Sequence, residues 1–447
     1  MKIGDEFILD IKRLGINGEG IGYYNKLAIF VNNALPKEGH KVRVTRVENK
    51  MAFAESLEVL HKSDDRVEPK CEFCSECGGC GVMHIKYDSM CNFKRDMVIE
   101  AISRYTKLNP RSFEIRETVK SDKEFNYRNR SILPVSMNKE HKLELCMIKS
   151  GTNHNVFIKD CLVHDELINK INNKILKYAD EIAVSPYNPK TKTGILRFVS
   201  VRVNSKNEAM VCFVCYEKSD LVNKLAKKVI GIEEVKSVYM NYNPSLKQGN
   251  IFSEDTTLLE GDEYLEMYLD DYKYKVLPTT FFQLNSNQAS KMNSIILKAC
   301  KLSKKEVVVD AYCGVGSISL YLSKLAKKVI GIEYDKNAIE LAKENAKLNK
   351  INNTEFLQGD SAKIFKDMIK EVDVLVVDPP RTGLTDEFVN NILERNIKRV
   401  VYVSCNPATF AKNLDKLSSK YSVSSITPLD MFPQCPNVEL IATLNLK

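Results

Sequence analysis

The sequence predicts a multidomain α/β protein in which a small all-β unit comes first, a β-rich central region follows and an α/β unit with a parallel sheet ends the chain. Three observations support this prediction. The chain has 447 residues, which is more than one hydrophobic core usually organises. Short apolar runs with glycine corners fill the first 60 residues. From about residue 300 onward, buried apolar runs alternate with helical patterns.

Residues 1–60 are expected to form a small barrel of the OB type. Short strands are predicted at 7–11, 27–31 and 41–47, and glycines between 15 and 22 supply a turn. Short strands with glycine corners fit a five-stranded barrel, which is a frequent platform for nucleic acids.

Residues 61–265 contain a dense group of cysteines. Of 13 cysteines in the chain, four are separated by two residues each, at Cys71, Cys74, Cys77 and Cys80. A glycine-bearing loop of this kind brings several thiolates within reach of one metal centre. A disulfide framework is disfavoured, because the first residues carry charges where a secretory segment needs an apolar stretch. The spacing alone does not distinguish zinc from an iron–sulfur cluster.

The same region has a basic segment at 120–130. Lys123, Tyr127, Arg128 and Arg130 mix cations with an aromatic ring, which suits contact with phosphates and stacking on bases. A solvated strand face is the alternative interpretation. The other elements predicted in this region are a helix at 87–108 and strands at 195–203 and 209–216.

Residues 266–447 carry the parallel-sheet pattern, in which a first buried strand runs into a glycine loop. A predicted strand at 306–310, with valines at 307–309, leads into Ala311–Gly316, and a helical pattern follows. Glycines at such a turn let the backbone approach a ligand closely. The next strand, 328–332, ends at Glu333, about 20 positions after the loop, where a Rossmann-like unit holds a ribose diol.

Two later strands end in polar loops that carry reactive groups. Strand 374–377 ends at Asp378–Arg381, and strand 399–403 ends at a loop that contains Cys405. Open α/β sheets bind ligands in the crevice beyond their strand ends, so an exposed nucleophile belongs there. The alternative for Cys405 is a buried cysteine that acts as a small hydrophobe.

This ordered set of motifs resembles the S-adenosylmethionine-dependent methyltransferases of the Rossmann-like class, and more specifically the RNA uracil-5-methyltransferase family. The segments that carry the resemblance are Phe281–Asn285, Asp378–Arg381, Ser404–Thr409 and Asp430–Pro433. An NAD-binding unit fits less well, because Ser319 stands where a third glycine is usual and Cys405 would have no role. The N-terminal unit resembles the TRAM domain at 17–22 and 35–39.

The resemblance implies a covalent mechanism in which Cys405 adds to C6 of a uracil and makes C5 nucleophilic. It further implies that Glu439 removes the C5 proton after methyl transfer. Family members often carry His two residues before this glutamate, where this chain has Asn437. The residues that match the family's methyl-donor contacts are Gln283, Tyr312, Glu333 and Asp378, with Asp360 at the adenine amine.

The resemblance also favours a [4Fe-4S] cluster over zinc. Several family members hold such a cluster with three cysteines spaced C-x5-C-x2-C and a fourth much later, which matches Cys71, Cys77, Cys80 and Cys161. Cys74 is then an extra cysteine, and a local tetrad that includes Cys74 in place of Cys161 stays open. The expected role is structural, joining distant segments into an RNA-binding surface.

Together these features predict a cytoplasmic enzyme that methylates C5 of a uridine in 23S ribosomal RNA, because the TRAM domain is typical of family members acting on ribosomal RNA. The alternatives are a transfer-RNA uridine methyltransferase, a catalytically silent RNA-binding protein and an amino-group methyltransferase. A formal charge of +8 is compatible with an RNA partner, the apolar runs are too short for a membrane span, and no obligate protein partner is evident.

Overall fold

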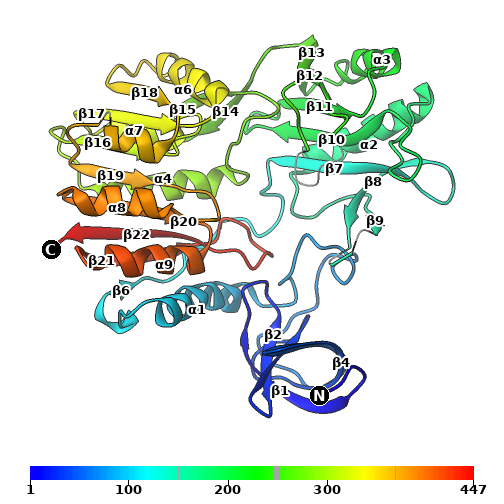
Figure 1. Ribbon diagram of the computed structural model, residues 1–447. Helices are drawn as coiled ribbons and strands as arrows, with labels where there is room; N and C mark the ends of the chain where they lie inside the picture. The colour runs from blue at the N-terminus through cyan, green and yellow to red at the C-terminus, as the bar shows by residue number, and fades with distance from the viewer. Residues whose placement is uncertain (150, 153, 246–250, 368) are drawn as a thin grey trace. The chain divides into compact units, whose positions relative to one another are not determined.

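The computed structural model describes residues 1–149, 151–152, 154–245, 251–367 and 369–447 (Figure 1). The chain divides into two compact units. The first comprises Met1–Ser75, Gly79–Asp122 and Val376–Lys447, and the second comprises Glu76–Gly78 and Lys123–Leu375. The chain passes between the units several times, so these units do not coincide with the boundaries predicted from the sequence. Among the described residues, none of the helices is both long and apolar enough to cross a membrane.

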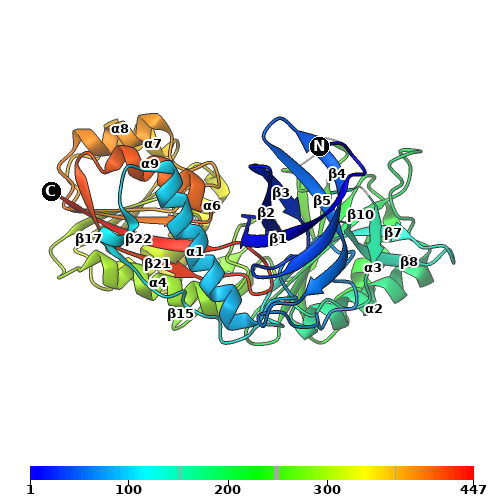
Figure 2. The same ribbon diagram turned by 90° about the horizontal axis from the view of Figure 1, so that it is seen from below.

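The first unit begins with a closed barrel whose strand order is β1-β2-β3-β5-β4. The strands are β1 (Glu6–Leu14), β2 (Gly20–Tyr24), β3 (Leu27–Val31), β4 (Gly39–Glu48) and β5 (Met51–His61). Alternate residues such as Leu9, Ile29 and Val42 point inward and are fully buried, as period-two alternation requires. Figure 2 shows these strands curving around one another. The barrel predicted for residues 1–60 is confirmed.

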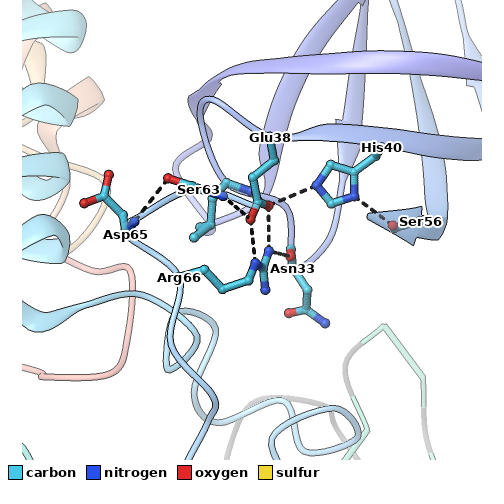
Figure 3. Close-up of polar contacts among 8 residues, drawn as sticks. Asn33, Glu38, His40, Ser56, Ser63, Asp65 and Arg66 are labelled. Atoms are coloured by element: carbon cyan, nitrogen blue, oxygen red, sulfur yellow. Dashed lines mark hydrogen bonds and ion pairs between the residues drawn. The ribbon is translucent and has the colours of Figure 1, made fainter. Parts of the chain in front are cut away.

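A buried carboxylate joins the barrel to the segment that leaves it (Figure 3). Glu38 is 1% exposed, and its Oε1 accepts a hydrogen bond of 2.6 Å from Nε of Arg66. Its Oε2 accepts from Arg66 at 2.7 Å and from the His40 ring at 3.0 Å. Burial by itself would raise the pKa of Glu38, but the hydrogen bonds from Arg66, Leu35, Ser63 and His40 outweigh it and hold the pKa at about 2.

Glu38→Gln is expected to destabilise the barrel by about 3 kcal/mol at neutral pH, because each unit of pKa shift is worth about 1.4 kcal/mol. The folded pKa lies below the ordinary 4.5, so this stability is present above pH 4.5 and is lost as the pH falls toward 2. Hydrogen exchange of the β1–β5 amides in the full chain measures the effect. The variant should exchange faster at pH 7, and the difference should shrink by pH 3. Glu55→Gln, at a solvent-exposed ion pair on the same barrel, is the control and should change little.

The rest of the first unit is a sheet with helices on it. Within this unit the strands follow the order β19-β20-β22-β21-β6, and β20, β22 and β21 are antiparallel neighbours. Helix α1 packs against α9 and β21. The elements are α1 (Tyr87–Tyr105), the short 3-10 helix η1 (Pro110–Ser112), β6 (Glu114–Ile115), β19 (Val374–Val377), α8 (Asp386–Glu394), β20 (Arg399–Ser404), α9 (Pro407–Leu417), β21 (Tyr421–Leu429) and β22 (Glu439–Leu446).

The second unit begins with a seven-stranded sheet of order β13-β12-β11-β10-β7-β8-β9. Its strands are β7 (Arg130–Met137), β8 (Leu143–Ile148), β9 (Asn155–Phe157), β10 (Leu196–Val203), β11 (Ala209–Cys215), β12 (Val235–Tyr242) and β13 (Thr256–Gly261). Helices α2 (Glu166–Ile182) and α3 (Asp220–Val229) belong to the same region and contact β10 and β12. Strand β11 is buried along its whole length, which is typical of a central strand covered on both faces.

The remainder of the second unit is a parallel α/β arrangement. Strands β18, β17 and β16 are parallel neighbours in that order, which fits the alternation of strands and helices in the sequence. The elements are the hairpin β14 (Leu265–Leu269) and β15 (Tyr272–Val276), then α4 (Ser286–Cys300), β16 (Val307–Ala311), α5 (Ser317–Ser323), β17 (Lys328–Glu333), α6 (Lys336–Leu348), β18 (Thr354–Gln358) and α7 (Ser361–Asp367). The predicted strands at 306–310, 328–332, 374–377 and 399–403 therefore lie within one residue of those observed.

Candidate active site

Cys405 lies in a short, strongly braced turn between β20 and α9 in the first unit. The next residue, Asn406, caps α9, because its side-chain oxygen accepts from the backbone N–H groups of Ala408 and Thr409. Its side-chain nitrogen donates to the carbonyl of Arg381 at 3.2 Å, and the Thr409 hydroxyl donates to the same carbonyl at 3.1 Å. These bonds tie the turn of Cys405 to the loop that follows β19.

The sheet register brings Glu439 near Cys405. Ser404 pairs with Leu440 in the antiparallel ladder of β20 and β22. Cys405 follows the last paired residue of β20 and Glu439 precedes the last paired residue of β22, so both lie at the same end of this ladder, and the charge of Glu439 acts on the Cys405 thiol. Glu439 is 8% exposed and Cys405 is half-buried. A thiol and a carboxyl group therefore share one end of the ladder.

Burial governs the ionisation of these groups. Burial, with the neighbouring charges of Glu439 and Asp378, raises the pKa of Cys405 to about 11, although Arg381 opposes the shift. Burial and Asp378 likewise raise the pKa of Glu439 to about 8, against the lowering effects of Arg381 and Lys94. Burial raises the pKa of Asp378 to about 6. Such a set of groups can hold and exchange protons near neutral pH.

The second unit brings Tyr312 and Glu333 to the strand ends of β16 and β17. One Glu333 oxygen accepts from the backbone N–H of Gly314 at 3.1 Å, and the other accepts from Tyr334 at 2.7 Å. Gly314 has a φ of 53° and Gly316 a φ of 85°, in the left-handed region that glycine tolerates best. Glu333 is therefore held against the glycine loop, with its carboxylate at the strand ends.

Asp360 and Gln283 also lie in the second unit. Burial raises the pKa of Tyr312 to about 12, with contributions from the charges of Asp360 and Glu333, so these three side chains lie near one another. Asp360 is exposed at the end of β18. Gln283 is half-buried, and its carbonyl accepts from the Asn129 side chain at 2.9 Å.

The basic segment at 120–130 corrects an expectation. Tyr127, Asn129 and Arg130 are 7–8% exposed, so they do not form a surface for stacking on bases. Arg130 instead donates to the carbonyls of Pro278 and Thr280, just before the Gln283 loop. Arg130 serves an internal function there, because buried backbone carbonyls need donors. Lys123 is exposed and Arg128 is half-buried, so the expectation of phosphate contact stays a prediction for these two cations.

The cysteines predicted as cluster ligands are divided between the two units: Cys71 and Cys80 lie in the first, and Cys77 and Cys161 lie in the second. Among the described residues, no group of three or more His, Cys, Asp or Glu side chains is arranged to hold a metal ion. In the first unit, the Cys74 backbone N–H donates to the Cys71 carbonyl at 3.1 Å. In the second unit, burial raises the pKa of Cys161, and the charge of Cys77 adds to the shift. Each unit holds only two of the four predicted ligands, so the [4Fe-4S] cluster stays a prediction.

A groove in the first unit was not predicted from the sequence. It has a volume of about 250 Å³ and is lined by the barrel, by α1 and by the start of α9 at Pro407, two residues after Cys405. Arg13 and Arg104 contribute cations to it, and Phe30 and Tyr105 contribute aromatic rings. Arg13 is paired with Glu100 at 2.8 Å. Sequence motifs do not reveal this groove, because its lining residues come from three elements that are separate in the sequence.

Two further residues beside the candidate site also escaped motif reasoning. Lys94, on α1, is fully buried and influences the pKa of Glu439. Tyr334 follows Glu333 and is 75% exposed, which leaves an aromatic ring uncovered beside the candidate donor site. The sequence signal for Tyr334 is an aromatic residue directly after Glu333, the acid predicted at the end of its strand.

The comparisons with known proteins agree over nearly the whole chain. The tRNA (uracil-5-)-methyltransferase family matches residues 87–446, and the TRAM domain matches residues 2–57. An uncharacterized RNA methyltransferase from Halalkalibacterium halodurans is 37% identical over 451 residues, covering 98% of this chain and 96% of that protein. Another from Clostridium acetobutylicum is 34% identical over 454 residues, covering 99% and 98%.

A solved structure is similar over the same length. The tRNA (uracil-54, C5)-methyltransferase of Pyrococcus abyssi, in complex with S-adenosyl-L-homocysteine, has a TM-score of 0.78 and 29% identity, covering 98% of this chain and 100% of that one. The methyltransferase fold and the N-terminal barrel predicted from the sequence are thereby confirmed. The chain belongs to the tRNA (uracil-5-)-methyltransferase family and carries a TRAM domain.

Proposed function

We propose that this protein transfers a methyl group from S-adenosylmethionine to C5 of a uridine in RNA through a covalent adduct with Cys405. The observation that supports the proposal is that Cys405 and Glu439 lie at the same end of the β20–β22 ladder, with the charges of Asp378 and Arg381 acting on both. The family match and the S-adenosyl-L-homocysteine bound by the Pyrococcus abyssi enzyme support the donor.

In the proposed reaction, Cys405 loses its proton to water and its sulfur bonds to C6 of the uracil, so that the electron pair of the C5–C6 double bond moves onto C5 and O4. C5 then takes the methyl group from the sulfonium of the donor, which leaves as S-adenosylhomocysteine. The C5 proton passes to Glu439, and the bond between sulfur and C6 breaks. Arg381 stabilises the thiolate, because its positive charge favours the ionised form of Cys405.

The uracil must present a ring face to Cys405, so it has to leave its stack. The target uridine therefore lies in a loop or bulge and enters the site flipped out.

We further propose that Tyr312, Glu333 and Asp360 bind the nucleoside part of the donor and that Gln283 and Asp378 orient polar groups of the donor or of the uracil. Glu333→Ala is expected to weaken binding of S-adenosylhomocysteine by about 10- to 100-fold, because it removes a charged hydrogen-bond acceptor. Titration calorimetry measures this loss. Glu355→Ala, at an exposed ion pair on neighbouring β18, is the control and should bind normally. Unchanged affinity in the Glu333 variant would refute the assignment.

The proposed RNA is 23S ribosomal RNA, since the TRAM domain is typical of family members that act on it. A transfer-RNA substrate is the second candidate, because the tRNA enzyme of Pyrococcus abyssi matches 98% of this chain, including the barrel. The groove with Arg13 and Arg104 supports an RNA partner of either kind. Mapping 5-methyluridine in ribosomal and transfer RNA from cells with and without the gene decides between them. A site lost only from transfer RNA would reject the first candidate.

The iron–sulfur cluster is proposed from the sequence resemblance alone, with Cys71, Cys77, Cys80 and Cys161 as its ligands. Iron and sulfide analysis of anaerobically purified protein tests it. Cys161→Ala should lose iron and Cys74→Ala should retain it. Loss of iron in the Cys74 variant alone would favour the local tetrad, and zinc in place of iron would reject the cluster.

A further inference from the structure

The first unit contains a fully buried ion pair between α1 and the loop that leads to Glu439. Lys94 and Asp430 each have a side chain that is 0% exposed, and the Lys94 ammonium group donates to a carboxylate oxygen of Asp430. The ammonium group also donates to the carbonyl of Phe432 at 3.1 Å. A single buried cation therefore binds the loop at two points.

Helix α1 holds the other oxygen of the same carboxylate. Tyr87 lies two turns before Lys94 on the same helix face, and its hydroxyl donates to Asp430 at 2.9 Å. The Tyr87 oxygen in turn accepts from the backbone N–H of Ser121 at 2.7 Å. Both oxygens of Asp430 are thus engaged by α1, one by a cation and one by a neutral donor.

The loop that is held in this way joins β21 to β22 and delivers Glu439 as the first residue of β22. Its anchor lies at the β21 end, because the Asp430 backbone N–H donates to the Val119 carbonyl at 3.0 Å. The position of Glu439 near Cys405 depends on how this loop enters β22.

Stability alone does not account for an ion pair at this depth. Removing two charges from water costs several kcal/mol each, and apolar replacements of buried pairs are often neutral or stabilising. Surface pairs in the same unit, such as Lys416 with Asp386, do not carry that cost.

We propose that Lys94 is a positioning residue for proton abstraction, because through Asp430 and Phe432 it fixes the loop that presents Glu439. The inference rests on the proposed function, because it takes Glu439 as the base that removes the C5 proton. Lys94 would contact neither uracil nor donor and would act only through Glu439.

The charged groups around Glu439 come from three elements besides its own. Asp378 and Arg381 follow β19, Cys405 follows β20, and Lys94 comes from α1, with Asp430 as its counterion. Asp378 raises the pKa of Glu439, whereas Arg381 and Lys94 lower it. Without Lys94, only Arg381 would still lower the pKa of Glu439 against the raising effects of burial and Asp378. A smaller fraction of Glu439 would then be ionised at neutral pH.

Two variants separate the charge of Lys94 from its structural contribution. Lys94→Met removes the cation with little change of volume, and the Lys94→Met/Asp430→Asn double variant also avoids a buried, uncompensated carboxylate. Lys416→Met removes an exposed cation from α9 and is the matched control. Circular dichroism and hydrogen exchange of β20 and β22 establish that each variant is folded.

The readouts are the pH dependence of steady-state turnover to methylated RNA and the amount of covalent RNA–protein adduct in a single turnover. In Lys94→Met the rising limb of the pH profile is expected to move upward by about one pH unit, as is typical for loss of a nearby opposite charge. The double variant also loses the negative charge of Asp430, so its rising limb should move upward by less. The methylated adduct should accumulate, because its decay requires the base, while formation of S-adenosylhomocysteine is less affected. Lys416→Met should match the wild type.

A folded double variant with the wild-type pH profile and no accumulated adduct would overturn the proposal. Equal slowing of every step at every pH would also overturn it, because that pattern indicates a purely structural role. If the wild-type protein itself forms no adduct with 5-fluorouridine RNA, the proposed function fails first, and the two failures are thereby distinguished.

Discussion

Cys405→Ala is expected to lower methyl transfer by about 10⁴-fold or more, because an alanine cannot add to C6 and removal of a covalent nucleophile usually costs this much. Transfer of labelled methyl groups from S-adenosylmethionine to RNA measures the loss. RNA that contains 5-fluorouridine gives a second measurement, since fluorine at C5 cannot leave as a proton and the adduct is trapped. The wild type should form a stable, mass-shifted complex with this RNA, and the variant should form none.

The control for this prediction is Cys300→Ala, which removes a thiol that is 0% exposed at the end of α4. It should retain the adduct. Methylated RNA from the Cys405 variant would refute the covalent mechanism and would favour amino-group methylation. A wild-type protein that binds RNA but neither methylates it nor forms the adduct would be a silent RNA-binding protein.

Glu439→Gln is expected to separate the two halves of the reaction. Glutamine keeps the size and hydrogen-bonding capacity of the side chain but cannot accept the C5 proton, so turnover should fall by about 10²- to 10⁴-fold. The adduct with ordinary uridine RNA should then accumulate after one methyl transfer. Denaturing gels and intact mass measure this species, whose mass includes the added methyl group.

The opposite result would be equally clear. If Glu439→Gln blocks adduct formation and no methylated adduct is found, Glu439 acts before methyl transfer, for example by accepting the thiol proton. Asp378, whose raised pKa is about 6, is then the remaining carboxyl group beside Cys405.

The local part of this arrangement could be predicted from the sequence. Strand 374–377 and the strand before Cys405 are short apolar runs that end in polar, proline-containing loops, and such patterns depend only on neighbouring residues. The cap at Asn406 follows from the same local pattern, since Asn before Pro is a strong helix start. The two strands are observed within one residue of their predicted positions.

The basic segment at 120–130 shows where the local signal fails. Cations mixed with amides and a tyrosine look the same in sequence whether they face RNA or buried carbonyls. Burial decided the outcome, because Arg130 and Arg202 supply donors to the carbonyl of Thr280 inside the second unit. The spacing of the cysteines is also only a local pattern. It identifies possible metal ligands near residue 75, but it cannot predict whether Cys161, which is far away in the sequence, lies close to them.

The sequence by itself determined which reactive groups this protein has, in what order, and on which strand ends they lie, because strand periodicity and turn chemistry are properties of adjacent residues. It also determined the family to which they belong. Only the tertiary structure decided that Glu439 stands near Cys405 and that Lys94 is buried behind it. Those relations depend on the antiparallel register of β22 with β20 and on the packing of α1, and both arise from contacts between segments far apart in the chain.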